Sequence, residues 1–143
     1  MKPRILILGS QGMAGHIIKT YLLELGYEVF STSREKNRSK NHFYYDVLED
    51  IVQLDKIIAS VKPDFVINCI GILNKAAEED KEGAVLVNSY LPHYVDALSE
   101  KYRFKFIHIS TDCVFSGKKE NITKKIYLTR HHFMAAQKPL AKL

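Results

Sequence analysis

Apolar and polar residues follow one another in blocks that predict strands and helices in turn. Short, mostly apolar runs bounded by polar residues or glycine are typical of buried parallel strands, and they occupy residues 5–8, 28–32, 43–45, 65–70 and 104–109. An apolar repeat of 3.6 residues predicts helices, and it occupies residues 12–25, 48–61 and 83–102. The polar stretches between these elements, residues 33–41 and 71–83, are expected to be loops.

Strands that alternate with helices predict an α/β fold, a doubly wound parallel sheet of the Rossmann type. Right-handed connections give five strands the order 3-2-1-4-5, and we assign this domain to residues 1–117. Ligands of such sheets bind at the carboxyl ends of the strands, near the point where the strand order reverses. Each predicted strand here ends in polar or small residues, so we expect these residues to meet along one rim.

Three glycines with a spacing of three follow the first predicted strand. Glycine permits a sharp turn into the next helix, and its bare backbone lets a phosphate approach the helix N-terminus, where N–H groups and the helix dipole favour an anion. The spacing is G-x-x-G-x-x-G and not the usual G-x-G-x-x-G, so a turn without ligand is the alternative. We predict a dinucleotide pyrophosphate site made by Gly9, Ser10, Gln11, Gly12, Met13 and Gly15.

The next two strand ends bear on the choice between NADPH and NADH as the cofactor. Ser33 and Arg34 stand where an acidic residue would favour NADH. A hydroxyl and a cation suit the 2′-phosphate of NADPH instead, with a solvated loop as the alternative. Asp46, followed by Val47, ends the third strand at the expected edge of an adenine pocket, although a helix N-cap is an equally good interpretation.

The remaining polar positions have more specific expectations. Asn88 lies on an apolar helix face and must find a hydrogen bond when buried, so we expect it to bridge to the neighbouring strand. The end of the fourth strand is expected to pass under the adenosine half of the cofactor, through Cys69, Ile70 and Gly71.

Composition narrows the class of protein. The chain has 143 residues, 46% hydrophobic and 26% charged, which is ordinary for a globular domain. Cys69 and Cys113 lie in apolar settings without disulfide or metal spacing, which indicates free thiols in a reducing cytoplasm and no metal site. Neither a signal peptide nor an apolar run of about 18–20 residues is present, so we expect no membrane partner.

The net charge of +5 is concentrated at one end of the sequence. Residues 118–143 contain seven Lys or Arg and one Glu, whereas residues 1–117 contain 14 basic and 15 acidic side chains. The predicted domain is therefore close to neutral, and we expect no nucleic-acid partner. The basic tail, residues 118–143, has little periodicity.

A second informative stretch is Ser110-Thr111-Asp112-Cys113-Val114-Phe115-Ser116-Gly117. Hydroxyl groups at the end of the fifth strand can hydrogen-bond a substrate carbonyl, and a turn capped by Asp112 is the alternative. Together with the glycine motif, Asp46-Val47, residues 66–69 and Val87-Asn88, this stretch resembles the dTDP-4-dehydrorhamnose reductases. These are extended short-chain dehydrogenases/reductases, and the resemblance covers about residues 4–117.

The resemblance implies an NAD(P)H-dependent reductase of a nucleotide-activated 4-keto-6-deoxysugar, active in polysaccharide synthesis. It implies that Ser110 is among the cofactor contacts and that Thr111 contacts the substrate carbonyl. It also implies a Tyr-x-x-x-Lys pair, in which Tyr donates a proton and Lys lowers the Tyr pKa. No tyrosine of this chain has a lysine four residues later, and the family's sixth strand and substrate domain have no counterpart.

A change of reading frame would account for this departure. Residues 128–143 can be back-translated so that the shifted frame reads Asp-Ser-Thr-Ser-Phe-Tyr-Gly-Arg-Thr-Lys-Ala-Leu-Gly-Glu-Ile, which contains the expected pair. We hypothesise a frameshift near Lys119 and expect a catalytically impaired product, with a functional basic tail as the alternative. A non-catalytic dinucleotide- or partner-binding module is the alternative function, and the exposed edge of the fifth strand predicts self-association.

Overall fold

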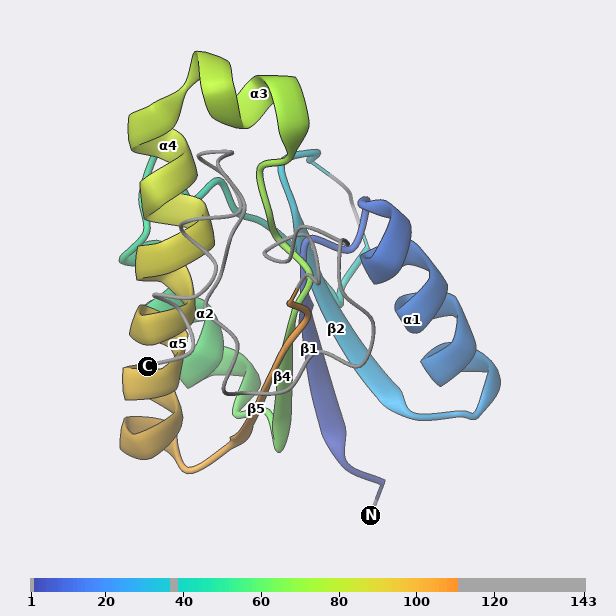
Figure 1. The fold of residues 1–143 in the computed structure, drawn as a ribbon. Helices are drawn as coiled ribbons and strands as arrows, with labels where there is room; N and C mark the ends of the chain where they lie inside the picture. Colours follow the sequence, from blue (N-terminus) through green and yellow to red (C-terminus); the bar gives the residue numbers. More distant parts are fainter. Residues whose placement is uncertain (1, 37–38, 111–143) are drawn as a thin grey trace, which may run out of the picture.

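The computed structural model describes residues 2–36 and 39–110, which form one parallel sheet with helices on both faces (Figure 1). The sheet has five strands in the order β3-β2-β1-β4-β5, as predicted. All neighbouring strands pair in parallel, and β1 lies at the centre between β2 and β4. The strands are β1 Arg4–Leu8, β2 Glu28–Ser33, β3 His42–Tyr44, β4 Phe65–Asn68 and β5 Lys105–His108.

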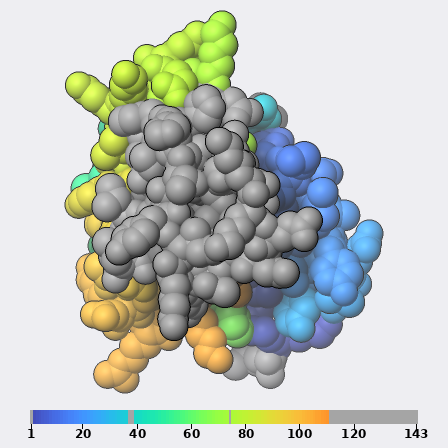
Figure 2. Space-filling view, in the orientation of Figure 1, coloured from blue at the N-terminus to red at the C-terminus, as the bar shows by residue number. Residues whose placement is uncertain are grey.

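The helices divide between the two faces of the sheet. α1 covers one face, and α2 and α5 cover the other, while α3 lies beyond the carboxyl ends of the strands (Figure 1). In the space-filling view, α1 and the α4–α5 side form opposite flanks, and α3 stands out at one end (Figure 2). The helices are α1 Met13–Glu24, α2 Gln53–Val61, α3 Asn74–Glu79, α4 Lys81–Val85, the π-helical η1 Leu86–Tyr90 and α5 Leu91–Tyr102.

Burial on both faces explains why β1 is a continuous apolar run. Successive side chains of a strand point to opposite faces, so Leu6 and Leu8 pack with α2 and α5, while Ile5 and Ile7 pack on the α1 side. All four side chains are buried. This two-sided core holds the strand ends in fixed positions along one rim of the sheet.

The second helix begins five residues later than the apolar repeat predicts. Residues 48–52 form turns, and the Asp50 carboxylate accepts hydrogen bonds from the backbone N–H groups of Val52 and Gln53. These bonds supply acceptors for donors that the first helical turn leaves unsatisfied. The helix therefore starts at Gln53, and the repeat of apolar residues before it belongs to the turn.

The expectation of a loop over residues 71–83 is wrong in part, because α3 and the start of α4 lie there. The Asp80 carboxylate accepts a hydrogen bond from Gly83 N–H at 2.9 Å and thereby caps α4. The polar stretch that was expected to be a loop thus contains a helix cap.

The predicted long helix is regular except at its middle. Pro92 has no N–H group to donate to the carbonyl four residues earlier, and the helix makes the π turn Leu86–Tyr90 directly before α5. Pro92 therefore follows a π turn within a continuous helical segment.

The predicted domain extends past the described residues. Thr111, Cys113 and the proposed tail, residues 118–143, lie outside them, as does the stretch 111–117 of the assigned domain. None of the helices in the described part of the chain combines the length and apolar character needed to cross a bilayer.

Candidate functional site

The turn after β1 brings the backbone of Gly9 against the end of β4. Gly9 has φ +77°, a left-handed conformation that glycine adopts readily. A Cβ atom at this position would lie 2.9 Å from Ile70 Cγ1 and 3.2 Å from Ile70 N. Both the conformation and the contact therefore require glycine, and the chain can turn from β1 directly into α1.

Gly12 and Gly15 differ in what surrounds them. A Cβ atom on Gly15 would overlap the carbonyl oxygen of Gly9, so close packing of α1 on the turn requires glycine. Among the described residues, a Cβ atom on Gly12 would meet only that same oxygen, at an ordinary contact distance of 3.4 Å. Gly12 is the N-cap of α1, where no side chain of residues 2–36 or 39–110 caps the helix. Its bare backbone leaves the helix N-terminus open toward the adjoining pocket.

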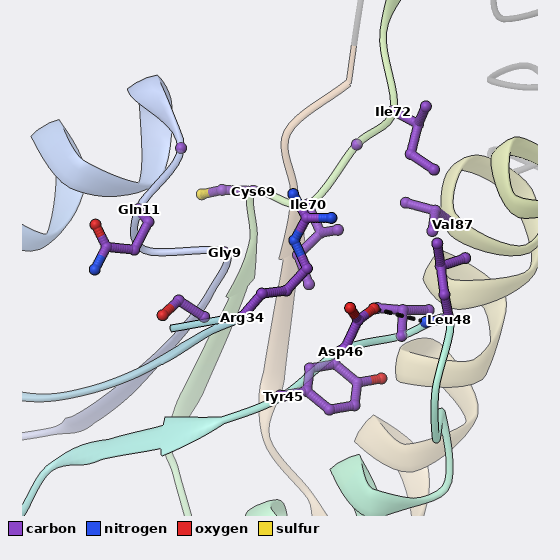
Figure 3. Close-up of a pocket in the computed structure, with 14 residues that line it drawn as sticks. Gly9, Gln11, Arg34, Tyr45, Asp46, Leu48, Cys69, Ile70, Ile72 and Val87 are labelled. Carbon is purple, nitrogen blue, oxygen red and sulfur yellow. Dashed lines mark hydrogen bonds between the residues drawn. The ribbon is translucent and has the colours of Figure 1, made fainter. Parts of the chain in front are cut away.

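A pocket of about 300 Å³ lies at the carboxyl ends of β1, β2, β3 and β4 (Figure 3). Ten of the predicted site residues line it: Gly9, Gln11, Gly12, Ser33, Arg34, Asp46, Val47, Cys69, Ile70 and Gly71. The residues come from four separate segments of the chain, as expected for a rim at the strand ends.

Other predicted residues do not line this pocket. Ser10 is buried, and its hydroxyl donates to Thr32 O at 3.2 Å, which ties the glycine turn to β2. Met13 is 85% exposed, and Gly15 packs beneath the turn. Ser110 is exposed past the end of β5. The binding roles predicted for all of these site residues, within the pocket or outside it, and for Thr111, stay predictions.

The end of β2 supplies the cationic side chain of the pocket. Arg34 points from this strand into the pocket (Figure 3). Within residues 2–36 and 39–110, no carboxylate forms a salt bridge with its guanidinium group. Nearby, Glu35 accepts a hydrogen bond from the side chain of Gln11 at 3.1 Å, which links the glycine turn to the segment after β2. A guanidinium group in this position can form charge-assisted hydrogen bonds to an anionic ligand.

Asp46 caps a turn and not the helix N-terminus that was considered for it, because α2 begins only at Gln53, with Val52 as its N-cap. Its carboxylate accepts a hydrogen bond from Leu48 N–H at 2.9 Å, drawn as a dashed line in Figure 3. This bond shapes the turn after β3, and the turn lines the pocket. A structural bond of this kind leaves the second carboxylate oxygen available for a ligand.

Asparagine side chains hold the segment after β4. Asn68 is fully buried, and its Oδ1 accepts from Ile70 N–H at 3.0 Å. Asn88 is also fully buried, and it both accepts from Ile72 N–H at 3.0 Å and donates to Ile72 O at 2.8 Å. The predicted bridge from Asn88 thus reaches the chain four residues beyond β4. These bonds fix the part of the pocket that contains Ile70 and Ile72.

Four lining residues were not among the predicted site residues: Tyr45, Leu48, Ile72 and Val87. Tyr45 and Leu48 flank the predicted pair Asp46-Val47, so proximity in the sequence could have suggested them. Val87 lies beside Asn88 within the π turn Leu86–Tyr90, and the sequence pointed to this pair only as part of the family resemblance. Ile72 is placed by its bonds to Asn88, which no local sequence pattern predicts.

Burial raises the pKa of two titratable groups at the pocket, Cys69 and Tyr45. Burial raises the pKa of the Cys69 thiol to about 11, so the group is protonated at neutral pH. Burial also raises the pKa of Tyr45 above its ordinary value, and its hydroxyl donates to Ile51 O at 3.4 Å. A tyrosine acid needs a pKa shifted toward neutrality. No three metal-ligating side chains cluster anywhere in the part of the chain that the structure describes.

Known proteins resemble both the sequence and this geometry. The family model described as "RmlD substrate binding domain" matches residues 1–130. A dTDP-4-dehydrorhamnose reductase of Burkholderia thailandensis is 29% identical over 119 residues, covering 82% of this chain and 37% of the relative. The chain thus spans well under half the length of this curated relative.

Two solved structures share the fold over about half of their own length. A hypothetical dTDP-4-dehydrorhamnose reductase from Sulfolobus tokodaii is 26% identical, with a TM-score of 0.82 over 97% of this chain and 50% of its own. The dTDP-4-dehydrorhamnose reductase of Bacillus anthracis, solved in complex with NADP, is 22% identical, with a TM-score of 0.82 over 99% of this chain and 48% of its own. Because the family model matches 130 of the 143 residues, the chain belongs to the RmlD substrate binding domain family.

Proposed function

We propose that this chain forms the dinucleotide-binding part of an NAD(P)H-dependent reductase of a nucleotide-activated 4-keto-6-deoxysugar. The observation that carries the proposal is the open N-terminus of α1 at Gly12, which adjoins the same pocket as Arg34. The solved Bacillus anthracis relative, with its NADP, supports the choice of cofactor. The Burkholderia relative supports the choice of a sugar-nucleotide substrate.

Each group of lining residues is assigned to one part of a bound dinucleotide. The backbone N–H groups at the start of α1 would bind the pyrophosphate, because a helix N-terminus attracts an anion. Arg34 and Ser33 would bind the phosphorylated ribose of the adenosine half. Asp46, Val47, Cys69 and Ile70 would enclose the adenine. When bound, the reduced nicotinamide supplies a hydride to the substrate carbonyl, and Ser110 and Thr111 would lie on that side of the cofactor.

We expect this chain to bind the cofactor without catalysing the reduction. No tyrosine has a lysine four residues later, so the proton donor that the family resemblance implies has no counterpart. We therefore expect the 143-residue chain to bind NADPH weakly and to reduce no substrate. We hypothesise that a frameshift near Lys119 accounts for the missing pair, and a non-catalytic dinucleotide- or partner-binding module is the second candidate function.

The test is a titration of the purified chain with NADPH, followed through the fluorescence of the reduced nicotinamide. Gly12→Ala is the matched variant, because within the described part of the chain the added methyl group meets only Gly9 O, at contact distance, yet lies where a phosphate would approach. We expect binding by the wild-type chain and at least tenfold weaker binding by the variant. Wild-type chain that binds neither NADPH nor NADH would refute the proposal. Oxidation of NADPH with a dTDP-4-keto-6-deoxysugar would refute the expected loss of turnover.

A further inference from the structure

A buried histidine lies behind the cofactor pocket without lining it. His42, at the start of β3, is 8% exposed and pairs in register with Ser31 of β2. Ser31 and Ser33 are two residues apart on β2, so their side chains point to the same face of the sheet. The imidazole ring of His42 contacts both hydroxyl groups, Ser31 Oγ at 3.0 Å and Ser33 Oγ at 3.1 Å.

The hydrogen bonds of the ring define its tautomer. His42 Nε2 lies 3.1 Å from the carbonyl oxygen of Glu35, which can only accept. Nε2 therefore carries the ring proton and donates it to both Glu35 O and Ser33 Oγ. In the neutral ring, Nδ1 is then the acceptor and receives the hydroxyl proton of Ser31. The result is a directed chain of bonds from Ser31 through His42 to the segment after β2.

This chain of bonds fixes the segment that carries Arg34. Ser33 Oγ accepts from Glu35 N–H at 3.2 Å, while Glu35 O receives a bond from His42 and a long one from Ser33 Oγ at 3.3 Å. Both backbone groups of Glu35 are thus bonded. Because His42 supplies one donor to the carbonyl, the Ser33 hydroxyl proton can turn to a ligand without leaving that carbonyl unpaired.

We propose that His42 is a positioning residue that favours NADPH over NADH, by holding Ser33 and Arg34 as donors for a 2′-phosphate. The inference rests on the proposed function, because it assumes that the pocket binds the adenosine half of a nicotinamide dinucleotide. It adds a residue that never touches the ligand. Loss of its donor would return the Ser33 hydroxyl proton to Glu35 O and loosen the turn around Arg34.

The test compares two substitutions in the full chain. His42→Phe keeps an aromatic ring but removes all three hydrogen-bond contacts of the ring, to Ser31 Oγ, Ser33 Oγ and Glu35 O, whereas His42→Gln keeps an N–H donor near the position of Nε2. Dissociation constants for NADPH and NADH are measured for each. We expect the wild-type chain to bind NADPH more tightly than NADH. We expect His42→Phe to weaken NADPH roughly tenfold and NADH less than about twofold, the size of one charge-assisted bond. His42→Gln should retain NADPH affinity within about threefold of the wild-type chain.

A purely structural role for His42 gives a different result. Equal weakening of NADPH and NADH by His42→Phe, or no change in either, would overturn the proposal. A double variant with Ser33→Ala should lose less NADPH affinity than the sum of the two single losses, since both changes act in part on one hydroxyl group. Additive losses would contradict a role through Ser33.

A measurement without cofactor separates this inference from the proposed function. Nitrogen-15 spectra of the histidine rings report which ring nitrogen carries the proton. We expect the resonances of His42, assigned by comparison with His42→Gln, to show protonated Nε2 and unprotonated Nδ1. The opposite tautomer would overturn the inference even when NADPH binds. Failure of the wild-type chain to bind either dinucleotide would instead refute the proposed function, and the cofactor preference with it.

Discussion

The glycine turn has two predicted roles, the packing of α1 and the binding of a ligand. A methyl group added at Gly15 tests the packing role, and a methyl group added at Gly12 tests the binding role. In Gly15→Ala, the new Cβ would overlap Gly9 O and lie 2.9 Å from Gly9 C and 3.0 Å from Ser10 Cα. These are backbone atoms of a turn held between two strands, so no side-chain rotation relieves the overlap. Overpacking of this kind costs roughly 3 kcal/mol. The gain in helix propensity from Gly to Ala returns about 1 kcal/mol, which leaves a loss of about 2 kcal/mol.

Gly12→Ala is the matched control. Its Cβ meets Gly9 O at 3.4 Å, and the backbone at φ −71° suits alanine. The weaker N-cap preference of alanine costs less than about 1 kcal/mol. Urea unfolding followed by circular dichroism measures both variants. With a slope of about 2 kcal/mol per molar, Gly15→Ala should lower the midpoint by about 1 M. The Gly12→Ala midpoint should fall by no more than about half of that. Equal midpoints for the two variants would refute the assignment of Gly15 to packing and Gly12 to ligand access.

Three further predictions concern the rest of the site and the tail. Asn88→Ala removes both bonds to Ile72 and should destabilise the chain by about 3 kcal/mol; a change below about 1 kcal/mol in urea unfolding would contradict the bridge. In a Cys113→Ser background, alkylation of Cys69 by iodoacetamide should be slow at pH 8 and should accelerate up to about pH 11, because burial raises its thiol pKa to about 11; fast reaction at pH 8 would contradict this pKa. Sequencing the coding DNA should reveal the Tyr-x-x-x-Lys codons in a shifted frame over residues 128–143, and an intact frame without them would exclude a frameshift.

Local sequence patterns were enough to predict the sheet and its order. Four buried side chains in a row in β1, followed at once by Gly9, leave few alternatives to a central parallel strand and a tight turn. Most of the pocket lining followed from the same reasoning, because every parallel strand delivers its last residues to the same rim.

What the sequence could not predict depends on contacts between distant segments. The ring of His42 joins two serines that are nine and eleven residues away in the chain, and no spacing rule links them. Ile72 is held in the pocket lining by a hydrogen bond to Asn88, which lies sixteen residues later in the chain. The start of α2 was misplaced because Asp50 accepts the N–H groups of the first turn, which overrides an apolar repeat that continues across it.

The π turn Leu86–Tyr90 sets the rotational phase between α4 and α5. In a regular α-helix each residue advances the side-chain direction by about 100°, so one extra residue in a turn rotates everything before it relative to everything after it. Asn88 faces Ile72 while Leu91 and Val95 face the sheet, and both orientations depend on that rotation. Deletion of a single residue from this turn would turn α4 by about the same angle. The pocket would then lose the support of Asn88 although no lining residue had been replaced.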